Sequence, residues 1–171
     1  FTCSNLPYPS TDPEAASASH PATGTLRAIE TREATGGTRV LMIGAHPDDV
    51  EFGCGGALIK YAMRGHRLFM LVLTGGGAGA DTQLRMKEQL ASKKIMGVKE
   101  IFWGGYDDTQ LQVDAGLIGK IEDVIAKVRP DFIFCNYHDD THQDHRHLSQ
   151  AVMSATRYIR NVLFYEGPTT Q

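Results

Sequence analysis

The sequence predicts an α/β fold, a Rossmann-like three-layer sandwich with a mainly parallel sheet, preceded by an extended N-terminal arm. Short apolar runs recur along the chain, and each is separated from the next by a segment whose apolar residues repeat at helical spacing. Such runs are typical of strands buried on both faces, as in parallel sheets. Their alternation with helices indicates βαβ units with right-handed crossovers, and therefore helices on both faces of one sheet.

Composition divides the chain into an arm at residues 1–36 and a folded domain at residues 37–171. The arm holds four of the seven prolines, is rich in Ser, Thr and Ala, and has few large apolar residues. That composition favours an extended segment without a core of its own. A chain of 171 residues with 42% hydrophobic and 22% charged residues otherwise has the size and composition of one globular domain.

Charge and hydropathy exclude several classes of protein. A formal net charge of −3 with no basic stripe argues against nucleic-acid binding, and no apolar run is long enough to span a membrane. The three cysteines lack the number and spacing of a disulfide framework. The first residues lack the pattern of a signal peptide, so we expect a cytoplasmic protein.

The first strand is expected at residues 40–44, where an apolar run ends at Gly44. A helix is expected at residues 55–63, because Gly65 then closes a segment of helical character. The next apolar run predicts a strand at residues 68–73, which a glycine-rich loop follows.

A second helix is expected at residues 82–96, because Gly97 stands where helices usually end. A short strand follows at residues 100–103, and then a loop rich in Gly and Asp at residues 104–113. We expect the buried side of the helix to carry Leu84, Leu90, Ile95 and Met96.

Two further βα units complete the prediction. Apolar residues at helical spacing predict a helix at residues 115–128, and a proline two positions later stops it. A strand at residues 131–135, a helix at 143–160 and a strand at 162–165 follow.

Two clusters of polar residues follow two of these strands. The first holds His46, Asp48 and Asp49, and the second, residues 138–147, holds four of the seven histidines. Because parallel strands end at one edge of a sheet, we expect the clusters to meet there. Histidine and aspartate suit Zn²⁺, although another divalent metal fits the same donors.

The spacing of these residues suggests which of them bind the metal and which face the reacting water. In an extended loop Asp48 and Asp49 point in opposite senses, so one binds the metal while the other faces the reacting water. His142 and His145 are three apart at a helix start, so both can reach one centre. The residues alone leave open which histidine is the ligand, and an Asp pair before a helix is often only a helix cap.

The glycines near the first cluster do not indicate a nucleotide site. Gly53, Gly55 and Gly56 lack the G-x-G-x-x-G spacing, and carboxylates at the strand-to-helix turn would repel a pyrophosphate. We interpret these glycines instead as letting the backbone turn tightly beneath the metal site.

At these residues the sequence resembles the PIG-L/LmbE family of zinc-dependent N-deacetylases, from about residue 38 to residue 165. The similarity rests on Ala45-His46-Pro47-Asp48-Asp49 with Gly53-Cys54-Gly55-Gly56, and on His142-Gln143-Asp144-His145. Thr74-Gly75 with Arg85 and Glu88 is similar to a weaker third pattern. The family often has an acid directly after the Asp pair, where this chain has Val50 and then Glu51.

The resemblance implies a role for each matched residue. It implies that Zn²⁺ is bound by His46, Asp49 and His145, and the choice of His145 as ligand comes from the family alone.

For catalysis the resemblance implies that Asp48 is the general base and that His142 stabilises the oxyanion or donates a proton. Asp144 would orient His142, and Arg85 would contact the substrate; a solvated helix arginine is the competing interpretation of Arg85.

The implied reaction removes the acetyl group of an N-acetylglucosamine-type small molecule, releasing acetate and a free amine. The alternatives are a catalytically impaired metal-bearing binding protein of the same fold and a metallohydrolase of another amide or a phosphoester. Asp48 favours the enzyme, because a protein that only binds metal has no use for a base there.

Members of the family usually continue beyond the point where this sequence stops. We therefore expect an intact metal site and an open or incomplete sugar pocket. A trimmed form, a natural short form, or a homo-oligomer whose partner subunit completes the site would each explain this.

Overall fold

The structure is a computed structural model that describes residues 37–78 and 81–167 of the chain. The predicted arm, residues 1–36, lies outside the described residues. None of the helices in the described ranges has the length and apolar character that a membrane span requires.

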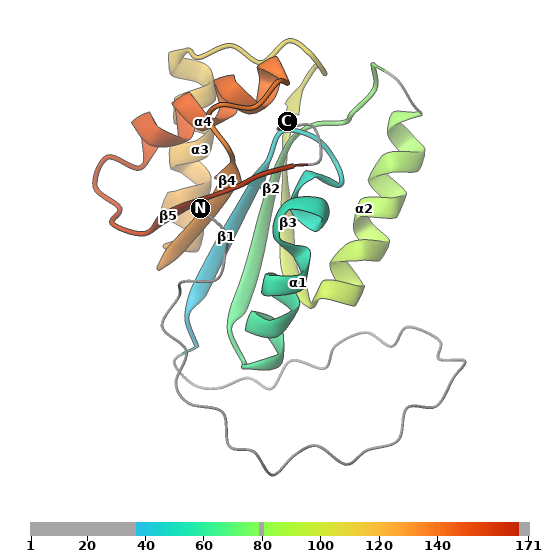
Figure 1. The fold of residues 1–171 in the computed structure, drawn as a ribbon, viewed down its shortest axis with the longest axis vertical. Coiled ribbons are helices and arrows are strands. Elements are labelled where there is room, and N and C mark those ends of the chain that lie inside the picture. The colour runs from blue at the N-terminus through green and yellow to red at the C-terminus, as the bar shows by residue number, and fades with distance from the viewer. Residues whose placement is uncertain (1–36, 79–80, 168–171) are drawn as a thin grey trace.

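The centre of the fold is a five-stranded, fully parallel sheet in the order β3-β2-β1-β4-β5 (Figure 1). The predicted α/β class and parallel sheet are thus confirmed. The strands are β1 (Arg39–Gly44), β2 (Arg67–Thr74), β3 (Val98–Tyr106), β4 (Phe132–Asn136) and β5 (Val162–Tyr165).

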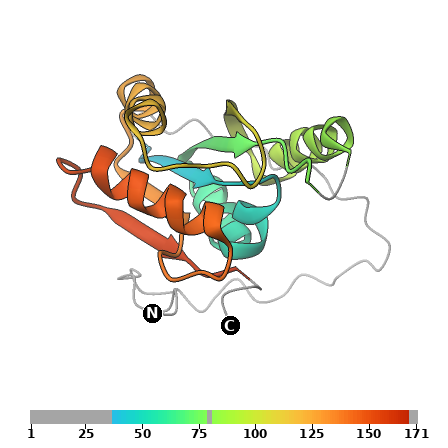
Figure 2. The ribbon, with the colours of Figure 1, turned by 90° about the horizontal axis from the view of Figure 1, so that it is seen from above.

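Four helices cover the sheet in two layers, as Figure 2 shows from above. Helices α1 (Asp49–Met63) and α2 (Thr82–Met96) pack on one face. Helices α3 (Ala115–Val128) and α4 (Gln143–Ala155) pack on the other face. This arrangement is the predicted three-layer sandwich.

Strand β1 shows why the sheet is buried on both sides. Val40 and Met42 pack toward α1, while Leu41 and Ile43 pack toward α3 and α4, and all four are fully buried. Successive side chains of a strand point to opposite faces, so a continuous apolar run fills both layers. The chain continues from β1 to β2 on one side and places β4 on the other, and this reversal opens a crevice at the carboxyl ends of β1 and β4.

Helix α1 begins at Asp49, six residues earlier than expected. The prediction that Gly53, Gly55 and Gly56 form a tight turn is therefore wrong, because all three lie inside the helix. Gly53 is needed for close packing: a Cβ at this position would overlap the ring of Tyr165. The glycine run thus lets β5 approach α1.

Helix α2 has its predicted ends but a different buried side. Leu84 and Leu90 are 53% and 44% exposed, whereas Gln89 is only 3% exposed. The buried residues are Gln89 and Met96, and Gln89 and the half-buried Ser92 face Glu51 of α1, so the expected apolar side is wrong for the two leucines.

Helix α4 ends at Ala155 instead of continuing to residue 160. The hydroxyl of Thr156 donates to the carbonyl of Val152 at 2.7 Å, and the backbone N–H of Thr156 donates to the same oxygen at 2.9 Å. No glycine or proline marks this end in the sequence, and for this reason the predicted helix is too long.

We expect Gly53→Ala to lower the free energy of unfolding by about 1–3 kcal/mol, because the added methyl group meets the Tyr165 ring in a filled core. Gly56→Ala is the matched control, since a Cβ there meets nothing within 4 Å. It should leave stability unchanged or raise it by up to about 1 kcal/mol, as alanine favours a helix. Chemical denaturation measures both, and equal stabilities of the two variants would contradict this account of Gly53.

Candidate active site

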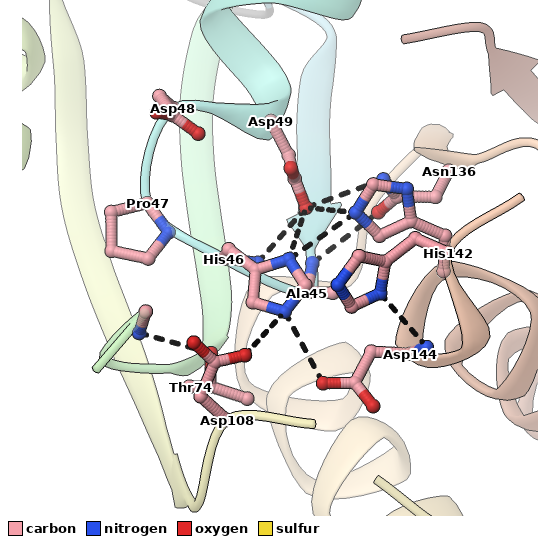
Figure 3. A network of polar contacts seen from close by, with 12 residues as sticks. Ala45, His46, Pro47, Asp48, Asp49, Thr74, Asp108, Asn136, His142 and Asp144 are labelled. Atoms are coloured by element: carbon pink, nitrogen blue, oxygen red, sulfur yellow. Dashed lines mark hydrogen bonds and ion pairs between the residues drawn. The ribbon is translucent and has the colours of Figure 1, made fainter. Parts of the chain in front are cut away.

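The two polar clusters meet at the carboxyl edge of the sheet, in the crevice between β1 and β4. A cavity of about 320 Å³ is lined there by six of the seven predicted site residues: His46, Asp48, Asp49, Arg85, His142 and His145. Figure 3 shows the polar contacts between the two clusters.

Three donor atoms converge in this cavity. His46 Nδ1 is 3.2 Å from His145 Nε2 and 3.5 Å from Asp49 Oδ2, and the last two atoms are 3.2 Å apart. Zinc bonds of about 2.0–2.1 Å in a tetrahedron separate the ligand atoms by roughly 3.3–3.4 Å. The three atoms therefore fit one tetrahedral ion.

The loop after β1 places Asp49 by local backbone geometry. Asp48 adopts a left-handed conformation with φ of 84°, and the helix begins at the next residue. Such a conformation costs about 1 kcal/mol or more in a residue other than glycine, and aspartate tolerates it better than most. Asp49 Oδ2 then accepts the backbone N–H of His46 at 2.9 Å and Asn136 Nδ2 at 3.3 Å.

The charge of Asp49 is strongly stabilised. Burial by itself raises the pKa of this carboxyl, but contacts with His145 and His46 outweigh burial and hold the pKa well below its usual range. Asp49 is therefore an anion at neutral pH, as a metal ligand must be.

Carboxylates hold the remote nitrogens of both histidines. His145 Nδ1 is 2.9 Å from Asp140 Oδ2, and His46 Nε2 is 3.0 Å from Asp108 Oδ1. Carboxylates in this position fix the ring orientation and the tautomer of metal-binding histidines. Burial lowers the pKa of His145, but Asp49 and Asp140 outweigh it and raise that pKa to about 9.

Asp144 occupies a different place from the one expected. Its fully buried carboxylate lies 3.2 Å from His46 Nε2 and accepts the backbone N–H groups of Thr109 and Leu111. We expected it to orient His142, but its carboxylate contacts His46. Only its backbone N–H reaches His142, donating to Nδ1 at 3.1 Å.

His142 caps the start of helix α4 through that bond. Because Nδ1 accepts a hydrogen bond, the proton of the neutral ring is on Nε2. Burial and the neighbouring His46 and His145 lower the pKa of His142, which favours the neutral ring. His142 thus offers the cavity an uncharged N–H donor.

Two wider groupings could also hold an ion. The ligand atoms of His46, His142 and His145, and those of His46, Asp108 and Asp144, each lie within 4.8 Å of one another. The group with Asp49 is tighter, and it leaves His142 Nδ1 and His46 Nε2 to their own hydrogen-bond partners. The group with Asp49 is therefore the most compact of the three that could hold an ion.

Asp48 also lines the cavity and carries a half-exposed carboxylate, whose Oδ2 is 3.0 Å from Arg85 Nη2. Burial raises its pKa, against the opposing effect of the Arg85 guanidinium. A raised pKa makes the carboxylate a better proton acceptor.

Arg85 also ties two loops together. Its guanidinium donates to the carbonyl of Pro47 at 2.7 Å and to the carbonyl of Gly76 at 3.0 Å. These hydrogen bonds join protein groups, and Arg85 also lines the cavity, where the predicted substrate contact remains a prediction.

Two carboxylates of this site were not assigned from the sequence. Asp140 lies within the histidine-rich residues 138–147, so its place in the sequence indicates that it is close to the site. Asp108 lies after β3, at the same sheet edge as the other clusters, but nothing in its neighbourhood pointed to His46. Asp108 also accepts the backbone N–H of Ala78 at 2.9 Å.

Comparison with known proteins places this geometry in a family. Residues 41–156 match the PIG-L family, described as GlcNAc-PI de-N-acetylase. Over 138 residues the chain is 36% identical to the uncharacterized deacetylase YaiS of Escherichia coli (strain K12), covering 77% of this chain and 75% of that protein. It is 33% identical over 123 residues to the diacetylchitobiose deacetylase of Thermococcus kodakarensis, covering 64% and 45% of the two chains.

A solved structure agrees with these sequence matches. The N,N'-diacetylchitobiose deacetylase from Pyrococcus horikoshii superposes with a TM-score of 0.68 at 27% identity, over 72% of this chain and 51% of that one. The chain thus spans about half the length of both chitobiose deacetylases. The family resemblance expected from the motifs is confirmed, and the chain belongs to the PIG-L family.

Proposed function

We propose that the chain is a metal-dependent deacetylase that removes the acetyl group from an N-acetylglucosamine-type substrate. The observation that carries the proposal is the convergence of His46 Nδ1, Asp49 Oδ2 and His145 Nε2. The carboxylate of Asp48 lines the same cavity and is bonded to Arg85. The named deacetylases among its relatives support the reaction. The cavity of about 320 Å³ that these atoms line is at the small end of the range for ligand pockets.

Zn²⁺ is the metal that we propose, with His46, Asp49 and His145 as its ligands. Two imidazole nitrogens and one carboxylate oxygen form a donor set typical of catalytic zinc. When bound, zinc would polarise the amide carbonyl and favour the ionisation of water. Asp140 and Asp108, with Asp144, would hold the two histidine rings in place.

Asp48 is the general base in this proposal. It accepts a proton as water adds to the acetamide carbonyl, and its raised pKa suits that task. Arg85 holds its carboxylate through Oδ2. The C–N bond then breaks as the amine takes up the proton that Asp48 accepted, so the products are acetate and a free amine.

His142 stabilises the charge that develops on the carbonyl oxygen. Its Nε2–H is fixed by the bond between Nδ1 and the Asp144 backbone, so the donor needs no reorganisation during the reaction. One such donor commonly contributes about 3–4 kcal/mol to transition-state stabilisation.

Metal analysis combined with acetate release tests the function. We expect one zinc per chain after addback, and acetate release from N-acetylglucosamine or diacetylchitobiose. A chain that binds zinc but releases acetate from no N-acetyl sugar would be the impaired binding protein, and release only from non-sugar amides would indicate the other metallohydrolase. Absence of metal after careful addback would contradict the site itself.

A further inference from the structure

Gln89 is a buried amide that connects helix α2 to the loop carrying Asp48. Gln89 is only 3% exposed. Its Oε1 accepts the backbone N–H of Asp48 at 3.0 Å, and its Nε2 donates to Glu51 Oε1 at 2.6 Å. The same Nε2 lies 3.2 Å from the sulfur of Met70. Gln89 therefore spans the gap between the two helices that cover this face of the sheet.

The direction of the amide follows from its partner on α1. Glu51 Oε1 is the acceptor in this contact, so it faces the NH₂ group of Gln89 and not its amide oxygen. Glu51 Oε1 also accepts the hydroxyl of Ser92 at 2.6 Å. With the NH₂ group held in this way, the amide oxygen of Gln89 is left to face the N–H of Asp48.

The backbone at Asp48 needs such a partner. Asp48 has a φ of 84°, and its carboxylate makes no hydrogen bond to cap helix α1. The carboxylate is instead turned to Arg85 and the cavity. An external acceptor for the Asp48 N–H thus helps to keep the backbone in a conformation that other residues avoid, and keeps the side chain at the cavity.

We infer that Gln89 is a positioning residue for Asp48. It acts through the backbone of Asp48 rather than by touching the substrate, and Glu51 sets the direction of its amide. The kinetic consequence depends on the proposed function, because it requires Asp48 to be the base. The structural consequence, a protected Asp48 N–H, does not.

Exchanging the amide of Gln89 and the carboxylate of Glu51 tests this positioning role. Gln89→Glu keeps the shape and the acceptor for Asp48 but places a carboxylate against that of Glu51. We expect kcat for acetate release to fall about 10- to 100-fold, as is typical when a catalytic group is misplaced, with zinc content retained and KM within about twofold. The double variant Gln89→Glu/Glu51→Gln restores an amide–carboxylate pair and should recover kcat to within about threefold.

Ser92→Ala is the matched control on the same helix. It removes one donor to Glu51 and leaves the contact between Gln89 and Asp48 in place, so kcat should stay within about twofold of wild type. Wild-type kcat in Gln89→Glu, or a double variant no more active than Gln89→Glu, would overturn the inference.

Hydrogen exchange at the Asp48 amide gives a readout that does not require activity. It should quicken at least about tenfold in Gln89→Leu and remain unchanged in Ser92→Ala, because only the first variant removes its acceptor. Unchanged Asp48 exchange in a folded Gln89→Leu would overturn the inference. If wild-type protein releases no acetate, the proposed function fails, and this exchange measurement still decides the role of Gln89.

Discussion

Asp48→Asn is expected to lower kcat for acetate release by about 10²- to 10⁴-fold while zinc content stays at the wild-type level. Asparagine keeps the size of the side chain, tolerates the left-handed backbone at this position, and still offers Arg85 an acceptor. It cannot take a proton from water. The loss should therefore appear in kcat, with metal binding preserved.

Asp114→Asn is a suitable control for this variant. Asp114 caps helix α3 by accepting the backbone N–H of Leu117, and asparagine is as good a cap. Its kcat should equal that of wild type. If Asp48→Asn retains both zinc and full kcat, Asp48 is not the base and the proposed mechanism is wrong.

His145→Ala is expected to abolish stoichiometric zinc binding and acetate release together. The change removes one of the three converging ligand atoms and one of the two histidines that stabilise the charge of Asp49. His147→Ala, on the same helix, should keep its zinc, because His147 Nδ1 instead contacts the carbonyl of Leu111 at 2.6 Å. Elemental analysis after gel filtration measures both variants. A His145→Ala protein that retains one tightly bound zinc would show that the ion has other ligands.

The pH dependence of zinc affinity tests the same site. Zinc requires a neutral His145, whose pKa is raised to about 9, so below that pH the ion must displace a proton. Affinity should therefore rise by about tenfold from pH 7 to pH 8 and level off above pH 9. Competition with a chelator of known affinity measures it. An affinity that falls as pH rises over this interval would exclude proton displacement as the controlling step.

The order of elements and the meeting of the two clusters could be predicted from the sequence. Runs such as Val40–Ile43 are apolar on both faces, and that property alone demands a sheet covered by two helix layers. Because all strands are parallel, the residues that follow β1 and those that follow β4 lie at the same edge of the sheet. His46 and His145 are ninety-nine positions apart and are thus expected to meet; in the structure His46 Nδ1 lies 3.2 Å from His145 Nε2.

Local geometry at the start of α1 was predicted less well. The glycines predict a tight turn and a helix that begins only at residue 55, because glycine favours turns over helix interiors. In the structure the helix begins directly after Asp48, and the glycines serve the contact with Tyr165 from β5. A contact between residues so far apart in the chain leaves no periodic signal.

The parallel α/β sandwich and the cluster of His and Asp residues at its edge are predictable from short segments of the chain, because strand burial and residue type are local properties. Packing between distant segments settles three further features: which side of α2 is buried, which carboxylates lie next to His46 and His145, and the contact of Asp144 with His46. Periodicity favoured Leu84 and Leu90, yet Gln89 is buried instead, because α2 packs on α1 through polar groups that bind Asp48 and Glu51. Such choices depend on how two helices are rotated against each other, and that rotation is fixed by the sum of contacts between them.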